Sequence, residues 1–149
     1  MSDETERLDD LYSEEEAKNE YLIHCRLNEK HNVLRFNVAG TSFRKDQLDV
    51  VHKHYLKRKA NGFHTEISLV PEPTNQYDPN AVKVLAFMDT QKLANPEMIF
   101  FGYVPKKETN MVCDWRHRHP NHTIRIAYMG DNHTGTGNIG CIVELKETN

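Results

Sequence analysis

Six short stretches of this chain are read as strands, and in the first of them apolar and polar residues alternate, as is typical of a strand with one buried face. In the first stretch, Leu34, Phe36 and Val38 share one face. The next three are rich in Val, Ile and Phe, residue types that favour strands. We predict strands at Val33–Ala39, Thr65–Val70, Ala81–Phe87, Met98–Val104, Thr123–Met129 and Ile139–Lys146.

Apolar residues recur at helical spacing in two further segments, Asp46 to about Gly62 and Glu108 to His117. The residues expected on the buried side of the first helix are Leu48, Val51, Tyr55 and Leu56. Those of the second helix are Met111, Val112 and Trp115. Six short strands with two intervening helices predict a mainly β (α+β) fold, a small OB-like six-stranded β-barrel, rather than a parallel α/β sheet.

The chain before residue 33 has a different character. Met1–Tyr12 is polar and acidic, which is typical of a disordered terminus. A capping box at Ser13–Glu16 and apolar residues at near-helical spacing predict a helix over Ser13–Arg26. A strand over Tyr21–Leu27 is the alternative, and 28–32 is read as a linker. We therefore expect an acidic, partly helical extension (1–32) before a β-barrel domain (33–149).

The net charge of −3 conceals an asymmetry. Residues 1–33 hold 10 acidic and 4 basic residues, a net of −6, whereas residues 34–149 hold 12 acidic and 15 basic ones, a net of +3. A mildly basic body predicts a few phosphate contacts rather than a wrapped duplex. With no membrane-length apolar run and no secretory signal, we expect an intracellular protein, cytoplasmic in a bacterium or phage and nuclear in a eukaryote.

Catalytic motifs are missing from the sequence. Neither the phosphate-binding loop of ATPases nor the nucleophile elbow of hydrolases is present, so we expect no enzyme and no cofactor. The three cysteines are read as reduced thiols. Four-residue spacing places Cys113 and His117 on one helix face, but a structural zinc site usually has two such ligand pairs. A metal site using these two with His119, His122, His133 and Cys141 is therefore the less favoured alternative.

The loop between the second and third predicted strands, Pro71–Asn80, is unusually constrained. Its three prolines fix their own φ angles and favour extended geometry in the residues before them. Asn75, Asp78 and Asn80 are residue types that stabilise turns through side-chain hydrogen bonds. Such a loop presents polar and aromatic side chains at low entropic cost, as a recognition site requires. A rigid hairpin connection without a binding role is the alternative.

Three segments together resemble the HIRAN domain. The first, Phe36–Arg44, is a strand followed by a glycine, an aromatic residue and a basic residue. The second is the Asn-x-Tyr-Asp-x-Asn-Ala sequence of Asn75–Ala81, and the third is the Gly-Tyr-Val-Pro-Lys sequence of Gly102–Lys106. The resemblance extends from about Leu34 to the last strand. HIRAN domains occur at the front of fork-remodelling DNA translocases and as free-standing proteins. No motor motif accompanies this one.

The resemblance implies a pocket for the free 3′ end of single-stranded DNA, in DNA repair or replication-fork processing. Asp78 would accept a hydrogen bond from the terminal 3′-hydroxyl and repel the phosphate of a continuous strand. Phe43 and Tyr77 would stack on the last bases, while Asn75 would bond sugar, base edge or its own loop. The residues expected to meet the DNA backbone are Arg44, Tyr103, Lys106 and Lys107.

Two departures from the family pattern predict weaker or more relaxed binding. Gln76 stands where many HIRAN loops have proline, and Ser42 stands where some relatives carry a basic residue. A DNA-processing protein is a further expected partner. A protein-interaction module on the same fold is the main functional alternative, and a metal-dependent nuclease is the least favoured one.

Overall fold

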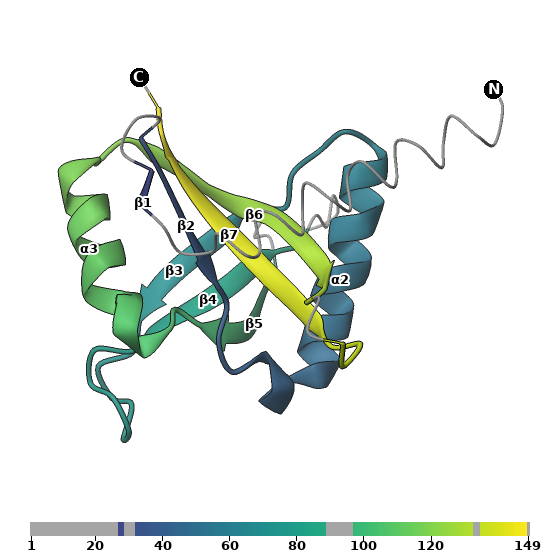
Figure 1. Ribbon diagram of the computed structural model, residues 1–149, viewed down its shortest axis with the longest axis horizontal. Helices are drawn as coiled ribbons and strands as arrows, with labels where there is room; N and C mark the ends of the chain where they lie inside the picture. The colour runs from purple at the N-terminus through teal and green to yellow at the C-terminus, as the bar shows by residue number, and fades with distance from the viewer. Residues whose placement is uncertain (1–26, 29–31, 89–96, 133–134, 149) are drawn as a thin grey trace, which may run out of the picture.

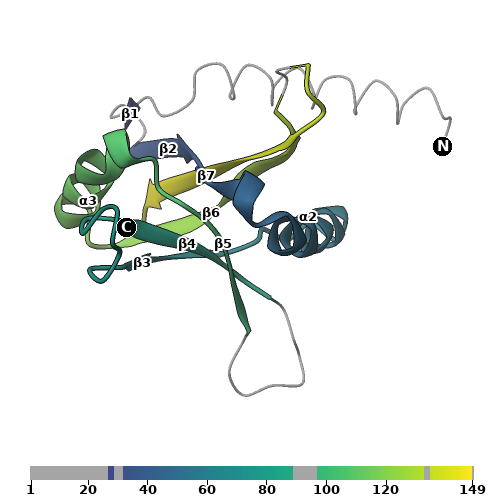
Figure 2. The same ribbon diagram turned by 90° about the horizontal axis from the view of Figure 1, so that it is seen from below.

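A computed structural model describes residues 27–28, 32–88, 97–132 and 135–148 (Figure 1). The described strands form two antiparallel sheets, with the orders β1-β2-β7-β6 and β3-β4-β5. Figure 2 shows the first sheet lying over the second. The strands are β1 Leu27–Asn28, β2 Val33–Asn37, β3 Ile67–Pro71, β4 Val82–Phe87, β5 Met98–Tyr103, β6 His122–Asp131 and β7 Ile139–Glu147.

The predicted mainly β fold is confirmed, and all six predicted strands are present with ends within two residues of the prediction. The closed barrel is not formed in the described residues. Isolated bridges join the sheets at only two corners, Ala39 to Tyr103 and Glu66 to Arg125. Because β2 ends at Asn37 and the chain turns at Gly40 with a φ of 74°, only Ala39 reaches β5.

Both predicted helices are present, and they flank the sheets on opposite sides (Figure 1). They are α2, Lys45–Ala60, and α3, Thr109–Arg118; the 3-10 turns η2, Thr41–Phe43, and η3, Lys106–Glu108, lead into them. Leu48, Val51 and Tyr55 of α2 are buried, but Leu56 is 49% exposed. The prediction for Leu56 was wrong because a helix turns about 100° per residue and carries it off the stripe that faces the sheets.

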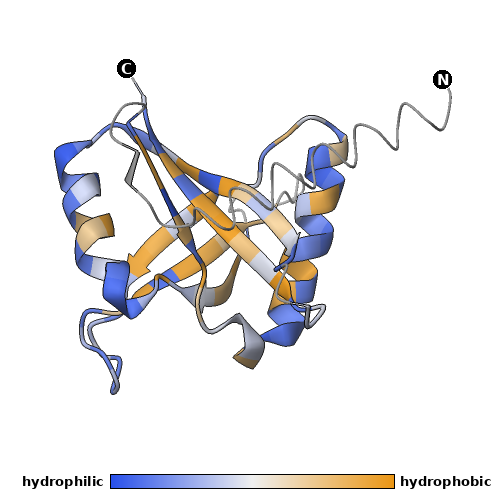
Figure 3. Cartoon of the chain, in the orientation of Figure 1, coloured by the Kyte–Doolittle hydropathy of each residue, from blue (hydrophilic) through white to orange (hydrophobic). Residues whose placement is uncertain are grey.

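One hydrophobic core lies between the sheets and against both helices. Figure 3 shows hydrophobic residues along the strands and hydrophilic ones on the outer turns of the helices. Trp115 from α3, Phe36 from β2 and Phe101 from β5 are its largest fully buried side chains. Burying a side chain of this size stabilises the fold by roughly 1.5–3 kcal/mol. The core thereby fixes the ends of β2, β3 and β5, where the candidate site lies.

The N-terminal extension is described only at its end. The helix predicted over Ser13–Arg26 lies outside the described residues, as does the alternative strand up to Arg26. Leu27 and Asn28 pair with Leu34 and Val33 as strand β1. Assigning Asn28 to the linker was therefore wrong, because its backbone joins the edge of the four-stranded sheet.

Gly102 permits the close approach of β5 to the end of β2. A Cβ added there would lie 2.3 Å from Val38 Cγ1 and 2.7 Å from the Ala39 carbonyl oxygen. We expect Gly102→Ala to lower the free energy of unfolding by about 1–3 kcal/mol, the usual range for overpacking. Urea denaturation measures this loss. Gly135→Ala, at a glycine whose added Cβ would meet nothing within 4 Å but whose φ of 82° disfavours side chains, separates overpacking from backbone strain.

Candidate nucleic-acid interface

A cavity of about 640 Å³ opens at the end of the molecule where β2, β3 and β5 terminate. Two backbone hydrogen bonds of 2.8 Å between Ala39 and Tyr103 hold η2 against the end of β5. A third of 2.8 Å, from Glu72 N–H to the Ala81 carbonyl, closes the loop between β3 and β4. The lining residues are Ala39, Gly40, Phe43, Arg44, Glu72, Asn75, Gln76, Tyr77, Asp78, Ala81, Tyr103, Val104 and Lys106.

Asn75 organises the loop. Its Oδ1 accepts hydrogen bonds from the backbone N–H groups of Tyr77 at 2.8 Å and Asp78 at 3.0 Å. Its Nδ2 donates to Glu72 Oε1 at 2.7 Å. Asn75 was predicted to bond a sugar, a base edge or its own loop, and in the structure it forms hydrogen bonds within its own loop. The amide thereby sets the direction in which Tyr77 and Asp78 leave the backbone.

The two carboxylate oxygens of Asp78 have different environments. Oδ1 accepts a hydrogen bond of 2.9 Å from Asn80 N–H, which is the turn-stabilising role of an Asx residue. Oδ2 makes no hydrogen bond to any part of the chain that the structure describes. Asp78 is half-buried and lines the cavity. One oxygen thus holds the turn while the other is available to a ligand.

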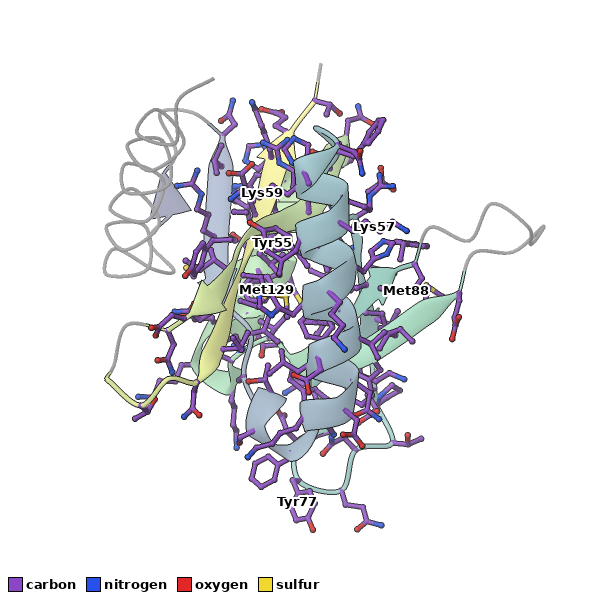
Figure 4. All side chains as sticks on the ribbon, turned by 90° about the vertical axis from the view of Figure 1, so that its right-hand side faces the viewer. Tyr55, Lys57, Lys59, Tyr77, Met88 and Met129 are labelled. Carbon is purple, nitrogen blue, oxygen red and sulfur yellow. The ribbon has the colours of Figure 1, made fainter. Side chains whose placement is uncertain are left out.

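Phe43 and Tyr77 are almost fully exposed, at 86% and 91%. Phe43 ends η2 and Tyr77 lies in the loop, so the two rings approach the cavity from different segments. Figure 4 shows Tyr77 at the lower tip of the molecule, away from the core. Two large rings at one cavity, both outside the core, offer flat apolar surfaces on which bases can stack.

The basic residues predicted for the site differ in position. The Arg44 guanidinium lies 4.4 Å from the ring centroid of Phe100 and 5.2 Å from that of Tyr103, and its Nη1 donates to the Gly40 carbonyl at 3.3 Å. Stacking and the hydrogen bond fix its charge at the cavity. Lys106 also lines the cavity. Lys107, the next residue of η3, is exposed but does not line the cavity.

Glu72 is the acidic centre of the site, and the sequence analysis missed it. Its Oε1 accepts hydrogen bonds from the Tyr103 hydroxyl at 2.8 Å and from Asn75, while Oε2 lies 3.8 Å from Lys83 Nζ. The bonds from Asn75 and Tyr103 lower the pKa of Glu72. Burial first, and then the bond to Glu72, raise the pKa of Tyr103. Pro71 and Pro73, which constrain Glu72 on both sides, were the signal in the sequence.

Comparison with known proteins places these residues in a family. The sequence model of the HIRAN domain matches residues 31–128, two thirds of the chain. The chain belongs to the HIRAN domain family. The match spans every predicted site residue, and because HIRAN domains are DNA-binding modules it supports a DNA-binding role for this one. No curated protein and no solved structure matches significantly.

The candidate metal ligands of this HIRAN domain do not form one cluster within the described residues. Cys113 is exposed on α3, whereas Cys141 is buried in β7, where burial raises its thiol pKa strongly. His122 Nδ1 donates to the His119 carbonyl at 2.6 Å, so its contacts are with protein groups. His133 lies outside the described residues. No group of three possible metal ligands occurs in the part of the chain that the structure describes.

The structure also bears on the expectation of a protein without membrane spans. Among the described residues, no helix is long and apolar enough to cross a bilayer.

The lowered pKa of Glu72 predicts a pH dependence of stability. A carboxyl whose pKa is lower in the folded than in the unfolded chain stabilises the fold at a pH above its pKa in the unfolded chain. This contribution is lost as the pH falls through the pKa of the carboxyl in the folded chain. We expect Glu72→Gln to remove part of the loss of stability below about pH 4.5. Thermal melts from about pH 3 to 7 measure it. Glu66→Gln, which removes an exposed carboxylate just before β3, is the control, and an equal effect of both variants would contradict the prediction.

Proposed function

We propose that this HIRAN domain is a non-catalytic module that binds the free 3′-hydroxyl end of single-stranded DNA, in DNA repair or replication-fork processing. One observation carries the proposal. Asp78, whose Oδ2 makes no hydrogen bond in the described residues, lines a cavity bordered by two rings that are 86% and 91% exposed. The fold positions these groups, yet neither ring contributes substantially to the core.

Asp78 supplies the discrimination between an end and a continuous strand. A terminal 3′-hydroxyl donates a hydrogen bond, and a bond to a carboxylate is stronger than one to a neutral acceptor. An internal nucleotide carries a phosphate at the same position. Its negative charge would then lie within a few ångströms of Asp78, with Glu72 also lining the cavity. The same group therefore favours ends and disfavours internal positions.

Phosphate contacts supply the affinity that does not depend on sequence. Arg44 and Lys106 line the cavity, and Lys107 is exposed beside Lys106. Neutralising about three phosphates of a single strand gives a slope of log affinity against log salt near −2, at about 0.7 per contact. Stacking on Phe43 and Tyr77 tolerates every base, so we expect little sequence preference.

Fluorescence anisotropy tests the proposal. Two oligonucleotides of one sequence, ending in 3′-hydroxyl or 3′-phosphate, are titrated with the full chain at low salt. The proposal requires tighter binding of the hydroxyl end. Equal affinities, or no binding of either, would refute it. A non-catalytic module should leave the DNA intact after prolonged incubation with Mg²⁺. Cleavage of the DNA would refute the proposal that the domain has no catalytic activity.

A further inference from the structure

A second cavity, of about 460 Å³, lies at the opposite end of β3. It is lined by His64 and Glu66, which precede β3, by Arg116 in the last turn of α3, and by Thr123 and Arg125 of β6. None of these residues lines the first cavity. Nothing in the 3′-end mechanism uses it.

Positive charge is in excess around this cavity. The buried carboxylate of Glu144 is shared by two arginines, with Oε2 2.8 Å from Arg35 Nη2 and Oε1 3.0 Å from Arg125 Nη2. Burial alone would raise the pKa of Glu144, but the bonds and charges of the two arginines outweigh it and lower the pKa. One negative charge thus faces two positive ones, and of these three groups Arg125 lines the cavity.

Arg116 adds a guanidinium that is only partly engaged. Its Nε donates to His122 Nε2 at 3.3 Å, and its terminal nitrogens make no hydrogen bond within the described residues. His122 Nδ1 donates to the His119 carbonyl, which leaves Nε2 as the acceptor. The guanidinium is therefore held from one edge while its other donors remain available. A fork of arginine donors matches the geometry of a phosphate group.

His64 adds an imidazole to the cavity wall. Partial burial, and then the charge of Arg125, lower its pKa, which favours the neutral ring. Arg58 lies beside it and donates to the His64 carbonyl at 2.7 Å. Among the residues that line the cavity, two arginines (116 and 125) face one glutamate (66).

We propose that this cavity is a second phosphate site, which binds the backbone of the same DNA strand several nucleotides before its 3′ end. The inference rests on the proposed function. Helix α3 links the two cavities, since Lys106 of η3 lines the first and Arg116 lines the second. Ten residues of helix span about 15 Å. The six residue-to-residue steps from Glu66 to Glu72, in extended conformation, span about 20 Å.

This separation sets a minimum length for the DNA. Stacked nucleotides advance by about 3.4 Å each, so roughly six of them cover 20 Å. A trinucleotide bound at the first cavity is too short to reach Arg116, whereas a dodecamer is long enough. A structural role for Arg116, at the negative end of the α3 dipole and against His122, would affect both oligonucleotides equally.

The test compares Arg116→Gln with Arg118→Gln, which removes a charge from the same helix turn but from an exposed arginine paired with Asp114. We expect Arg116→Gln to weaken dodecamer binding by about fivefold at low salt and to reduce the salt slope by about 0.7. Trinucleotide binding and the preference for 3′-hydroxyl should not change. Glu66→Gln, which removes a repelling carboxylate from the cavity, should strengthen dodecamer binding.

Other results would overturn the inference. Equal effects of Arg116→Gln and Arg118→Gln on the dodecamer, or an equal loss for the trinucleotide, exclude a second backbone site. A titration with inorganic pyrophosphate, followed by the NMR signals of the arginine Nε–H groups, separates two sources of phosphate. Saturation of Arg116 by pyrophosphate without any length-dependent effect on DNA would assign the cavity to a small phosphorylated ligand instead. Because these comparisons do not use the 3′ group, they distinguish failure here from failure of the proposed function.

Discussion

Replacing Tyr77 or Phe43 with alanine is expected to weaken binding of a short single strand by roughly 5- to 150-fold, the equivalent of 1–3 kcal/mol per stacked base. The two rings border one cavity and are exposed by 91% and 86%. A base stacked on either ring covers apolar surface that is otherwise in water. Anisotropy titrations of the single variants and of the double variant measure the loss, and an approximately additive effect would indicate two separate stacked bases.

Stability should remain unchanged in these variants, because neither ring is part of the core. Matching thermal melts of wild type and variants check this. Phe63→Ala is the matched control, since Phe63 is another exposed aromatic residue, at 60%, and stacks on Arg58 away from the first cavity. If Phe63→Ala weakened DNA binding as much as Tyr77→Ala, the loss would reflect general surface contact and the stacking prediction would fail.

Asp78→Asn is expected to reduce the preference for 3′-hydroxyl over 3′-phosphate to a ratio near one. Asparagine keeps an oxygen that can accept the bond from Asn80 N–H, so the turn is preserved while the charge is removed. A like-charge contact is worth several kcal/mol, so the wild-type ratio should exceed about tenfold. Asp78→Ala removes the turn bond as well and should lose more affinity. The ratio of dissociation constants for the two end groups measures the effect.

A long-range charge effect has to be separated from a local one. Asp114→Asn changes the net charge by the same amount at an exposed position of α3. We expect it to leave the end-group ratio unchanged, and raising the salt should not abolish the wild-type preference, because a contact within a few ångströms is poorly screened. Persistence of the full preference in Asp78→Asn would show that another group discriminates the ends.

Local sequence was sufficient for the secondary structure and for much of the site. Period-two alternation predicted β2 because one face of it is buried, and the 3.6-residue spacing of Leu48, Val51 and Tyr55 predicted α2 for the same reason. The order of three motifs led to the HIRAN family, which the family match confirms. Seven of the eight predicted site residues, all except Lys107, line one cavity.

Tertiary structure decided what depends on contacts between distant segments. Glu72 is the centre of the site because Tyr103, 31 residues later, donates to it, and no local pattern encodes that contact. The two sheets stay open in the described residues because β2 ends at Asn37 and β3 begins at Ile67, so that only single bridges at Ala39 and Glu66 join them. Strand and helix periodicity report which face of an element is buried, but they carry no information on which element lies opposite. Pairings such as Arg125 with Glu144, and the cavity beside them, therefore emerge only when the chain is folded.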